Sequence, residues 1–156
     1  MDIYQSLFSA AAMLNEQLAE EIFKAVPEEG PIIIIMDQAG NTLLSDPDAF
    51  AAMKISQSFL MELCARVDDG VEPVIAPVQQ CSVIASQLAG ERGCYGYIIL
   101  AIPQYSPEST LMSINLIEMI LNQVRLIVGL LEKNQQLYET RMKNYLRLEN
   151  YQTASN

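Results

Sequence analysis

Three cysteines are the side chains with the most evident reactive chemistry in this 156-residue sequence. Thiolates act as nucleophiles, redox centres and ligands of soft metals. Cys64, Cys81 and Cys94 lie 17 and 13 residues apart, so they form no Cys-x-x-Cys pair. The sequence has no histidine, which removes a histidine general base, a Cys–His pair and the usual zinc sites. We therefore predict reduced, structural thiols, no metal and no cofactor.

Carboxylates are the other abundant chemical group, with 19 acidic against nine basic residues and a net charge of −10. Adjacent pairs such as Glu20/Glu21 and Asp68/Asp69 point in different directions on a helix and do not form an acid/base pair. A strongly negative chain has the wrong sign for gripping phosphate backbones. The composition favours a protein that is not an enzyme and does not bind nucleic acid.

The N-terminus has no basic region of the kind that precedes a secretory signal. A membrane helix needs about 20 apolar residues. The longest apolar stretch, residues 111–131, is interrupted by polar and charged side chains, so we predict a cytoplasmic protein with no membrane partner. The interrupting residues are Asn115, Glu118, Asn122, Gln123 and Arg125.

Hydrophobic periodicity and turn residues divide the chain into alternating helices and strands. They predict an α+β fold in two layers: an antiparallel sheet of about five strands, with the N-terminal and C-terminal helices on one face. The predicted helices are residues 2–25, 47–67 and 107–150, and the predicted strands are residues 31–36, 42–45, 72–76, 78–88 and 94–102.

The last helix is the most informative element, because about 44 residues in one helix would be roughly 65 Å long and must project from a body of this size. Apolar residues three and four positions apart follow it as a heptad row, with gaps at Gln135 and Glu149. A second row ends near residue 131 and consists of Leu116, Ile120, Ile127 and Leu130. We predict a domain at 1–131, an extended coiled-coil helix and tail at 132–156, and a homodimer. Its interface would be Ile117, Leu121, Val124, Val128, Leu131, Tyr138, Met142 and Tyr145. The alternative is a tail that folds back on its own domain or frays.

Residues 74–137 resemble the second half of a GAF domain, a small-molecule sensor related to PAS domains. The resemblance rests on residues 73–77, 83–88 and 93–101 and on the helix at 116–123. It implies a bacterial signalling module whose closing helix continues into a parallel coiled coil. Only about 28 residues, 46–73, bridge the first hairpin to the later strands. This segment is short for the family, in which it covers the ligand.

The same resemblance places a small-molecule site between the sheet and the helix at 47–67. Strand alternation puts three polar residues on one face of their strand and two tyrosines on one face of the next. The same groups could instead form the solvent-facing side of an uncovered sheet. Gly96 is expected to let a helix approach the sheet closely. The candidate ligand residues are Gln80, Ser82, Ser86, Tyr95 and Tyr97.

These features together predict a non-enzymatic sensory or regulatory domain that dimerises and transmits a ligand-dependent or partner-dependent conformational signal. A downstream output domain or a separate partner protein would receive the signal. Two alternatives remain. One is a structural dimerisation module without a ligand. The other is a methionine sulfoxide reductase, since a GAF-fold enzyme of that class works with a set of cysteines, although the cysteine spacing here differs from its pattern.

Overall fold

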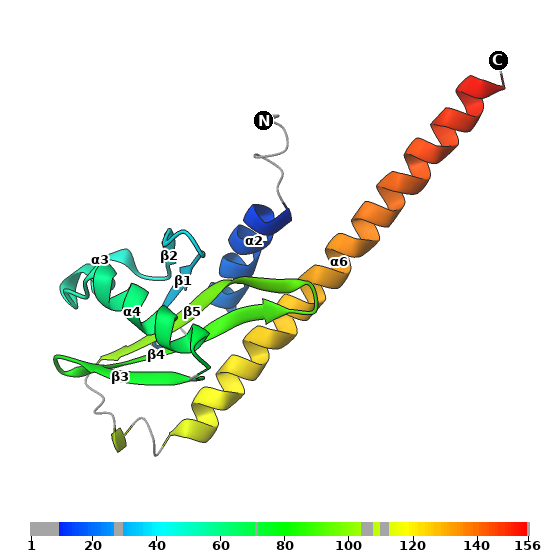
Figure 1. Cartoon of the computed structure of the whole chain (residues 1–156). Coiled ribbons are helices and arrows are strands. Elements are labelled where there is room, and N and C mark those ends of the chain that lie inside the picture. Colours follow the sequence, from blue (N-terminus) through cyan, green and yellow to red (C-terminus); the bar gives the residue numbers. More distant parts are fainter. Residues whose placement is uncertain (1–9, 27–29, 71, 104–107, 110–112, 156) are drawn as a thin grey trace.

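The structure is a computed structural model that describes residues 10–26, 30–70, 72–103, 108–109 and 113–155. Its centre is a five-stranded antiparallel sheet in the order β2-β1-β5-β4-β3 (Figure 1). The strands are β1 (Ile32–Met36), β2 (Thr42–Leu44), β3 (Val74–Val78), β4 (Cys81–Gly90) and β5 (Gly93–Pro103). The helices are α2 (Ala10–Ala25), α3 (Pro47–Ala52), α4 (Gln57–Asp68) and α6 (Ile114–Ala154). The predicted α+β class and antiparallel sheet are confirmed.

Strand β1 lies at the centre of the hydrophobic core because all five of its residues are apolar and buried on both faces of the sheet. A tight turn joins it to β2. The Asp37 carboxylate accepts hydrogen bonds from the backbone amides of Ala39 (2.9 Å) and Asn41 (2.8 Å). Gly40 adopts a positive φ of 91°, which costs glycine little. These contacts fix the hairpin that the turn residues predict.

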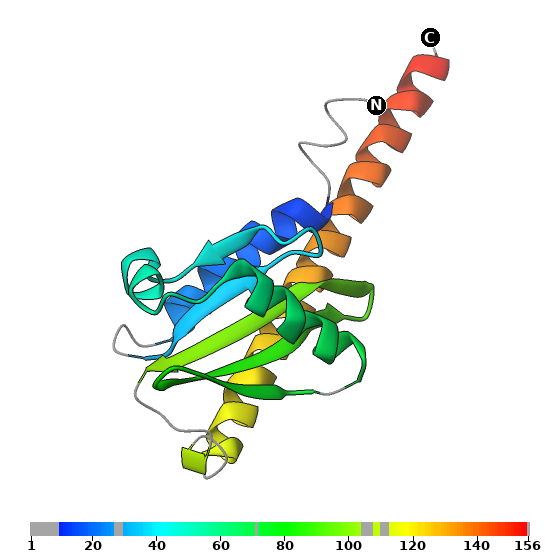
Figure 2. The same cartoon turned by 60° about the vertical axis from the view of Figure 1, so that its left-hand side comes forward.

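Helices cover both faces of the sheet (Figure 2). α2 and α6 pack on one face, as predicted, around side chains that include Ile33, Ile98 and Leu100. α4 packs on the other face, against a second core cluster that includes Ile34 and Ile99. The protein therefore has three layers. The predicted two-layer arrangement is wrong because both faces of β1, β4 and β5 are apolar, and each needs a cover.

The predicted helix at 47–67 is two helices. Lys54 adopts a positive φ of 52°, which interrupts the helix after α3. Ser56 then starts α4, and its hydroxyl oxygen accepts a hydrogen bond from the Phe59 amide (3.2 Å). Ser56 is an N-cap residue, a role that serine fills well because its oxygen satisfies a free amide of the first turn.

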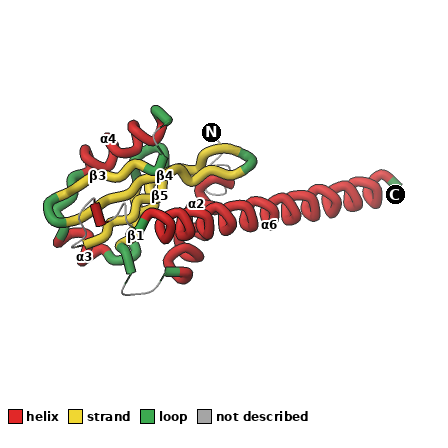
Figure 3. The backbone as a smooth tube through the Cα atoms, turned by 90° about the horizontal axis from the view of Figure 1, so that it is seen from below, coloured by secondary structure: helices red, strands yellow, loops and turns green. Residues whose placement is uncertain are grey.

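α6 is a single helix of 41 residues that runs across the predicted boundary at residue 132. Its first part lies on the sheet, and its second part extends beyond the sheet as one rod (Figure 3). The predicted projection is therefore present. The predicted starts of the first and last helices, at Asp2 and Pro107, lie outside the described residues.

Candidate functional site

The five predicted ligand residues do not share one cleft. Gln80 lies in the exposed turn between β3 and β4. Ser82 and Ser86 are buried in β4. They alternate with Val83 and Ala85, whose side chains belong to the core under α4, so they face α6 instead. The prediction that these groups line a site beside the helix at 47–67 is therefore wrong for the serines.

Tyr95 and Tyr97 lie on opposite faces of the sheet, although their spacing of two predicts the same face. Tyr97 belongs to the core under α4, and Tyr95 packs with the core under α2 and α6. The cause is a β-bulge, in which Leu88 pairs with Gly96 but Ala89 pairs with Cys94. The extra residue of a bulge reverses the alternation of side chains.

Gly96 makes this bulge possible. Its φ is +142°, and a Cβ atom there would collide with the carbonyl oxygen of Met36. The close neighbour is the backbone of β1. The prediction that Gly96 admits a helix is therefore wrong, because the residue admits an adjacent strand.

On the α4 face, Tyr97 joins the sheet to the end of α4. Its hydroxyl donates to the Asp68 carboxylate (2.7 Å), which also accepts a hydrogen bond from the side-chain amide nitrogen of Gln87 (3.2 Å). Burial, followed by this hydrogen bond and the negative charge of Asp68, raises the pKa of Tyr97 well above its ordinary value of 10. The contact holds α4 in place and leaves the phenol protonated at neutral pH.

On the other face, Glu132 of α6 joins the sheet to the long helix. This carboxylate is only 3% exposed, which is unusual for a glutamate. It accepts hydrogen bonds from the backbone amides of Glu91 (3.0 Å) and Arg92 (3.2 Å) at the tip of the β4–β5 hairpin. It also accepts one from the Tyr95 hydroxyl (2.5 Å). We call these four residues the Glu132 junction.

The hydrogen bonds of the Glu132 junction stabilise the ionised carboxylate. Burial alone would raise the pKa of Glu132, but the donation from Tyr95 and the two hairpin amides, with the charge of Arg92, lowers it below its ordinary value of 4.5. Burial and the neighbouring Glu132 carboxylate raise the pKa of Tyr95 to about 12. At neutral pH the junction is thus a carboxylate held by a protonated phenol and two amides.

Two neighbouring residues complete the connection. A Cβ atom on Gly90 would occupy the position of the Glu132 carboxylate, so the glycine makes room for it. Arg92, at the hairpin tip, forms an exposed ion pair (3.3 Å) with Glu139, which lies further along α6 than Glu132. The domain therefore contacts α6 as far as Glu139, beyond the boundary that the sequence predicts at residue 132.

A second polar contact between the sheet and α6 involves Glu72, next to the edge strand β3. The Ser86 hydroxyl and the backbone amide of Gln87 (3.1 Å) both donate to one oxygen of the Glu72 carboxylate. Arg125 of α6 forms an ion pair with the same oxygen (3.7 Å). Ser86, a predicted ligand residue, thus contacts a neighbouring carboxylate.

Sequence reasoning missed Glu132 and Glu72. Both are single acidic residues in a very acidic chain, so their residue type carries no signal. The one usable signal was the Gly-Glu-Arg-Gly sequence at 90–93, a tight turn whose amides need an acceptor. The acceptor is 40 residues away in the sequence, and only the tertiary structure identifies it.

Cys64 is not arranged as a reactive thiol. All three cysteines are free thiols, and Cys64 is buried in α4. Burial, with the charge of Asp68, raises the pKa of Cys64 to about 12, which keeps it protonated and unreactive. Within the described residues, no group of three or more cysteine, aspartate or glutamate side chains is arranged to hold a metal ion.

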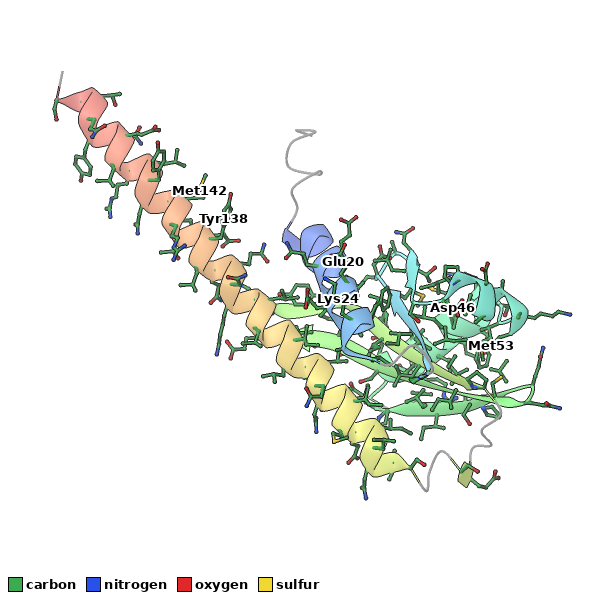
Figure 4. The ribbon with its side chains drawn as sticks, turned by 180° about the vertical axis from the view of Figure 1, so that it is seen from behind. Glu20, Lys24, Asp46, Met53, Tyr138 and Met142 are labelled. Carbon is green, nitrogen blue, oxygen red and sulfur yellow. The ribbon has the colours of Figure 1, made fainter. Side chains whose placement is uncertain are left out.

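The predicted dimer residues fall into two groups. Ile117, Leu121, Val124 and Val128 are buried against the sheet and α2. Their assignment to the interface is wrong, because the domain itself covers this row, and Leu131 is partly buried with it. Tyr138 and Met142 lie on the projecting half of α6 (Figure 4). Both are exposed, and so is Tyr145.

Other large apolar side chains of α6 are also exposed. By length and composition, α6 contains an 18-residue window apolar enough to cross a membrane, of which 22% is buried in the protein. Core helices of soluble proteins pass the same test, and here one row of the helix packs on the sheet. The exposed apolar side chains are Leu116, Met119, Leu126, Leu130, Leu137, Tyr138, Met142, Tyr145, Leu146, Leu148 and Tyr151.

Comparison with known proteins gives a likeness in fold. No protein-family model and no curated protein matches the sequence. A chain in the crystal structure of the E. coli DhaR(N)–DhaL complex is similar, with a TM-score of 0.56 and 17% sequence identity. The match covers 95% of this chain and 57% of that chain, so this chain spans little more than half of its neighbour's length. The neighbour was crystallised in a complex, so at a coarse level a fold of this kind is found in a protein–protein assembly.

Proposed function

We propose that this chain is a non-enzymatic regulatory module with a GAF-like layout. It dimerises through α6 and passes a conformational bias between the sheet and the projecting half of that helix. The observation that carries the proposal is the Glu132 junction, which lies where α6 leaves the sheet. A module of this kind needs a rigid contact at that point.

The mechanism is a two-state one. The β4–β5 hairpin and α6 are held together by three hydrogen bonds to one carboxylate, with oxygen–donor distances of 2.5–3.2 Å. A displacement of the hairpin tip would therefore move the carboxylate and the helix that carries it. Conversely, helix pairing that rotates α6 would strain or relax the hairpin amides. A ligand or partner protein that prefers one packing shifts the population of both states.

The surroundings of Cys64 and of three carboxylates support a function without catalysis. Cys64 has a raised pKa, and the carboxylates of Glu132, Asp68 and Glu72 each accept several hydrogen bonds from the fold itself. A methionine sulfoxide reductase would need a thiolate nucleophile, which Cys64 is poorly suited to provide. The partner protein in the structural neighbour's crystal favours a regulatory contact with another protein.

A test of the coupling is amide hydrogen exchange in the β4–β5 hairpin, measured at concentrations where the chain is monomeric and where it is dimeric. We expect the amides of Glu91 and Arg92 to exchange more slowly in the dimer. The dependence on concentration should disappear in Glu132→Ala and persist in the control Glu149→Ala, which alters an exposed glutamate near the helix end. If the exchange rates of the hairpin amides in the wild type did not depend on dimerisation, the proposed coupling would be contradicted.

A structural dimerisation module without a ligand is the second candidate. It is favoured by the packing, because buried apolar side chains fill both faces of the sheet and the predicted ligand residues diverge. Hydrogen exchange separates the two candidates, since a passive scaffold needs no link between the hairpin and the helix. A thermal-shift screen with nucleotides and metabolites adds a second readout, because only a sensor would be stabilised by one of them.

A further inference from the structure

The second apolar row of α6, which was predicted to end near residue 131, continues to Tyr151. Heptad a positions at every seventh residue from Ile120 include Ile127, Asn134 and Leu148. The d positions include three leucines and an aromatic residue. This row runs from Leu116 to Tyr151, about 53 Å at 1.5 Å per residue, and so spans both halves of the helix. The complete row is Leu116, Ile120, Gln123, Ile127, Leu130, Asn134, Leu137, Arg141, Asn144, Leu148 and Tyr151.

Burial separates this row from the row that the domain uses. Leu116, Leu130, Leu137, Leu148 and Tyr151 are all exposed. Ile120 and Ile127 are partly buried at the edge of the core under α2 and α6. The first row, by contrast, is occupied by the sheet up to Val128. A second helix can therefore reach one row along its whole length and the other row only beyond the sheet.

From this pattern we propose that the exposed row is the contact surface for α6 of a second copy, in a parallel and in-register two-stranded coiled coil. The inference rests on the proposed function, in that it names the partner and orientation of the same helix. Isoleucine at a with leucine at d favours two parallel strands. Asn134 at a then faces its own counterpart, an arrangement that fixes register and strand number at some cost in stability.

The flanking positions agree with parallel pairing. In such a pair a g residue faces the e residue five positions later in the partner. Leu126 then meets Leu131, Lys133 meets Tyr138, and Thr140 meets Tyr145. None of these contacts brings like charges together, and a lysine over a tyrosine ring is attractive. These positions also give the exposed Leu126, Tyr138 and Tyr145 a partner surface.

Beyond the sheet, the predicted first row is also interrupted by polar residues. In an in-register parallel pair, the next position after Tyr145 would set Glu149 against Glu149, and Gln135 would interrupt the row before Tyr138. The exposed row also contains the polar residues Gln123, Asn134, Arg141 and Asn144, of which Arg141 is the only charged one. It gains Leu116, Ile120, Ile127 and Leu130 as compensation, which the first row cannot offer because its own residues there are buried.

The deciding experiment compares two exposed residues five positions apart in the full chain. Leu137 is 59% exposed and lies in the proposed row, whereas Met142 is 44% exposed and lies in the first row. Sedimentation equilibrium should show a dimer whose dissociation constant rises more than tenfold in Leu137→Glu and less than twofold in Met142→Glu. Unchanged circular dichroism of dilute samples checks that both variants fold.

Orientation is tested by oxidative cross-linking. Leu137→Cys should give a covalent dimer, because a d residue faces its counterpart only in a parallel, in-register pair, while Met142→Cys should not. The wild type controls for its three native thiols. A dimer weakened more by Met142→Glu would overturn the row, and a dimer without cross-linking at Leu137→Cys would overturn the orientation. In both cases dimerisation survives.

A wild type that is monomeric at all concentrations would overturn both this inference and the proposed dimeric regulatory module. In that event, co-sedimentation with vesicles of phosphatidylcholine and phosphatidylglycerol asks whether a membrane covers the row. Binding of the monomer to vesicles, weakened by Leu137→Glu, would replace the second copy with a lipid surface. A wrong contact row and a chain that does not dimerise therefore give different results in these measurements.

Discussion

The two halves of α6 have a similar apolar periodicity but different surroundings. In the first half, one row of the helix is buried against the sheet and α2, and a second row is exposed. In the second half, which extends from Glu132, both rows are exposed. The periodicity of a helix therefore identifies its apolar rows without identifying what covers each of them. Glu132 marks the change, because it is the last buried residue of the helix.

The largest expected difference between the halves comes from removing a leucine side chain from each. Leu121→Ala leaves a cavity in the core under α2 and α6, and we expect a loss of about 3 kcal/mol in the free energy of unfolding. Leu146 is 52% exposed and lies outside the proposed row, so Leu146→Ala should change stability by less than about 0.5 kcal/mol. Urea denaturation measures both. Similar losses would mean that the projecting half is covered by the protein's own chain.

The next largest effect is expected at the boundary itself. Glu132→Ala leaves two hairpin amides and the Tyr95 hydroxyl without their acceptor, which should cost about 2 kcal/mol. Glu149→Ala, in the exposed half, should cost less than about 0.5 kcal/mol. Chemical denaturation of the two variants under one set of conditions makes the comparison. A loss at Glu132 no larger than at Glu149 would show that the junction does not stabilise the fold.

Two glycines sharpen the same contrast. Gly90→Ala would displace the Glu132 carboxylate, and we expect a loss of about 1.5 kcal/mol, since part of its hydrogen bonding survives. Gly129 of α6 has nothing within 4 Å of an added Cβ, so Gly129→Ala should stabilise the helix by up to about 1 kcal/mol. In a Glu132→Ala background, Gly90→Ala should become nearly neutral. An unchanged loss there would locate the clash elsewhere.

Much of the fold could be predicted from the sequence because apolar patterns and turn residues are local signals. The isoleucine run of β1, the hairpin at Gly40 and the length of α6 all follow from neighbouring residues. The break at Lys54 could not be predicted, because the apolar pattern continues through it. The bulge at Tyr95 could not be predicted either, since it depends on how β4 and β5 pair.

The candidate site was less predictable than the fold, for a physical reason. A buried carboxylate is stabilised by groups that come close only after folding, and here they are the hairpin amides, 40 residues before Glu132. The predicted dimer interface was wrong in its first half for a related reason. Two rows of similar periodicity compete for the sheet, and the choice between them depends on the tertiary packing of Leu121 and its neighbours.

The smallest expected effect is the pH dependence of the boundary. The pKa of Glu132 is lowered in the folded state, so its contribution to stability is fully present above its ordinary pKa of 4.5 and is lost as the pH falls through the lowered value. We therefore expect the stability difference between the wild type and Glu132→Gln to be constant above about pH 5 and to shrink below 4.5. Asp37, whose pKa is also lowered, is present in both proteins and cancels in this difference. Glu149→Gln should show no such acid-dependent difference. If the gap between the wild type and Glu132→Gln instead widened in acid, the folded state would favour the protonated carboxyl, and the Glu132 junction would not hold an ionised group.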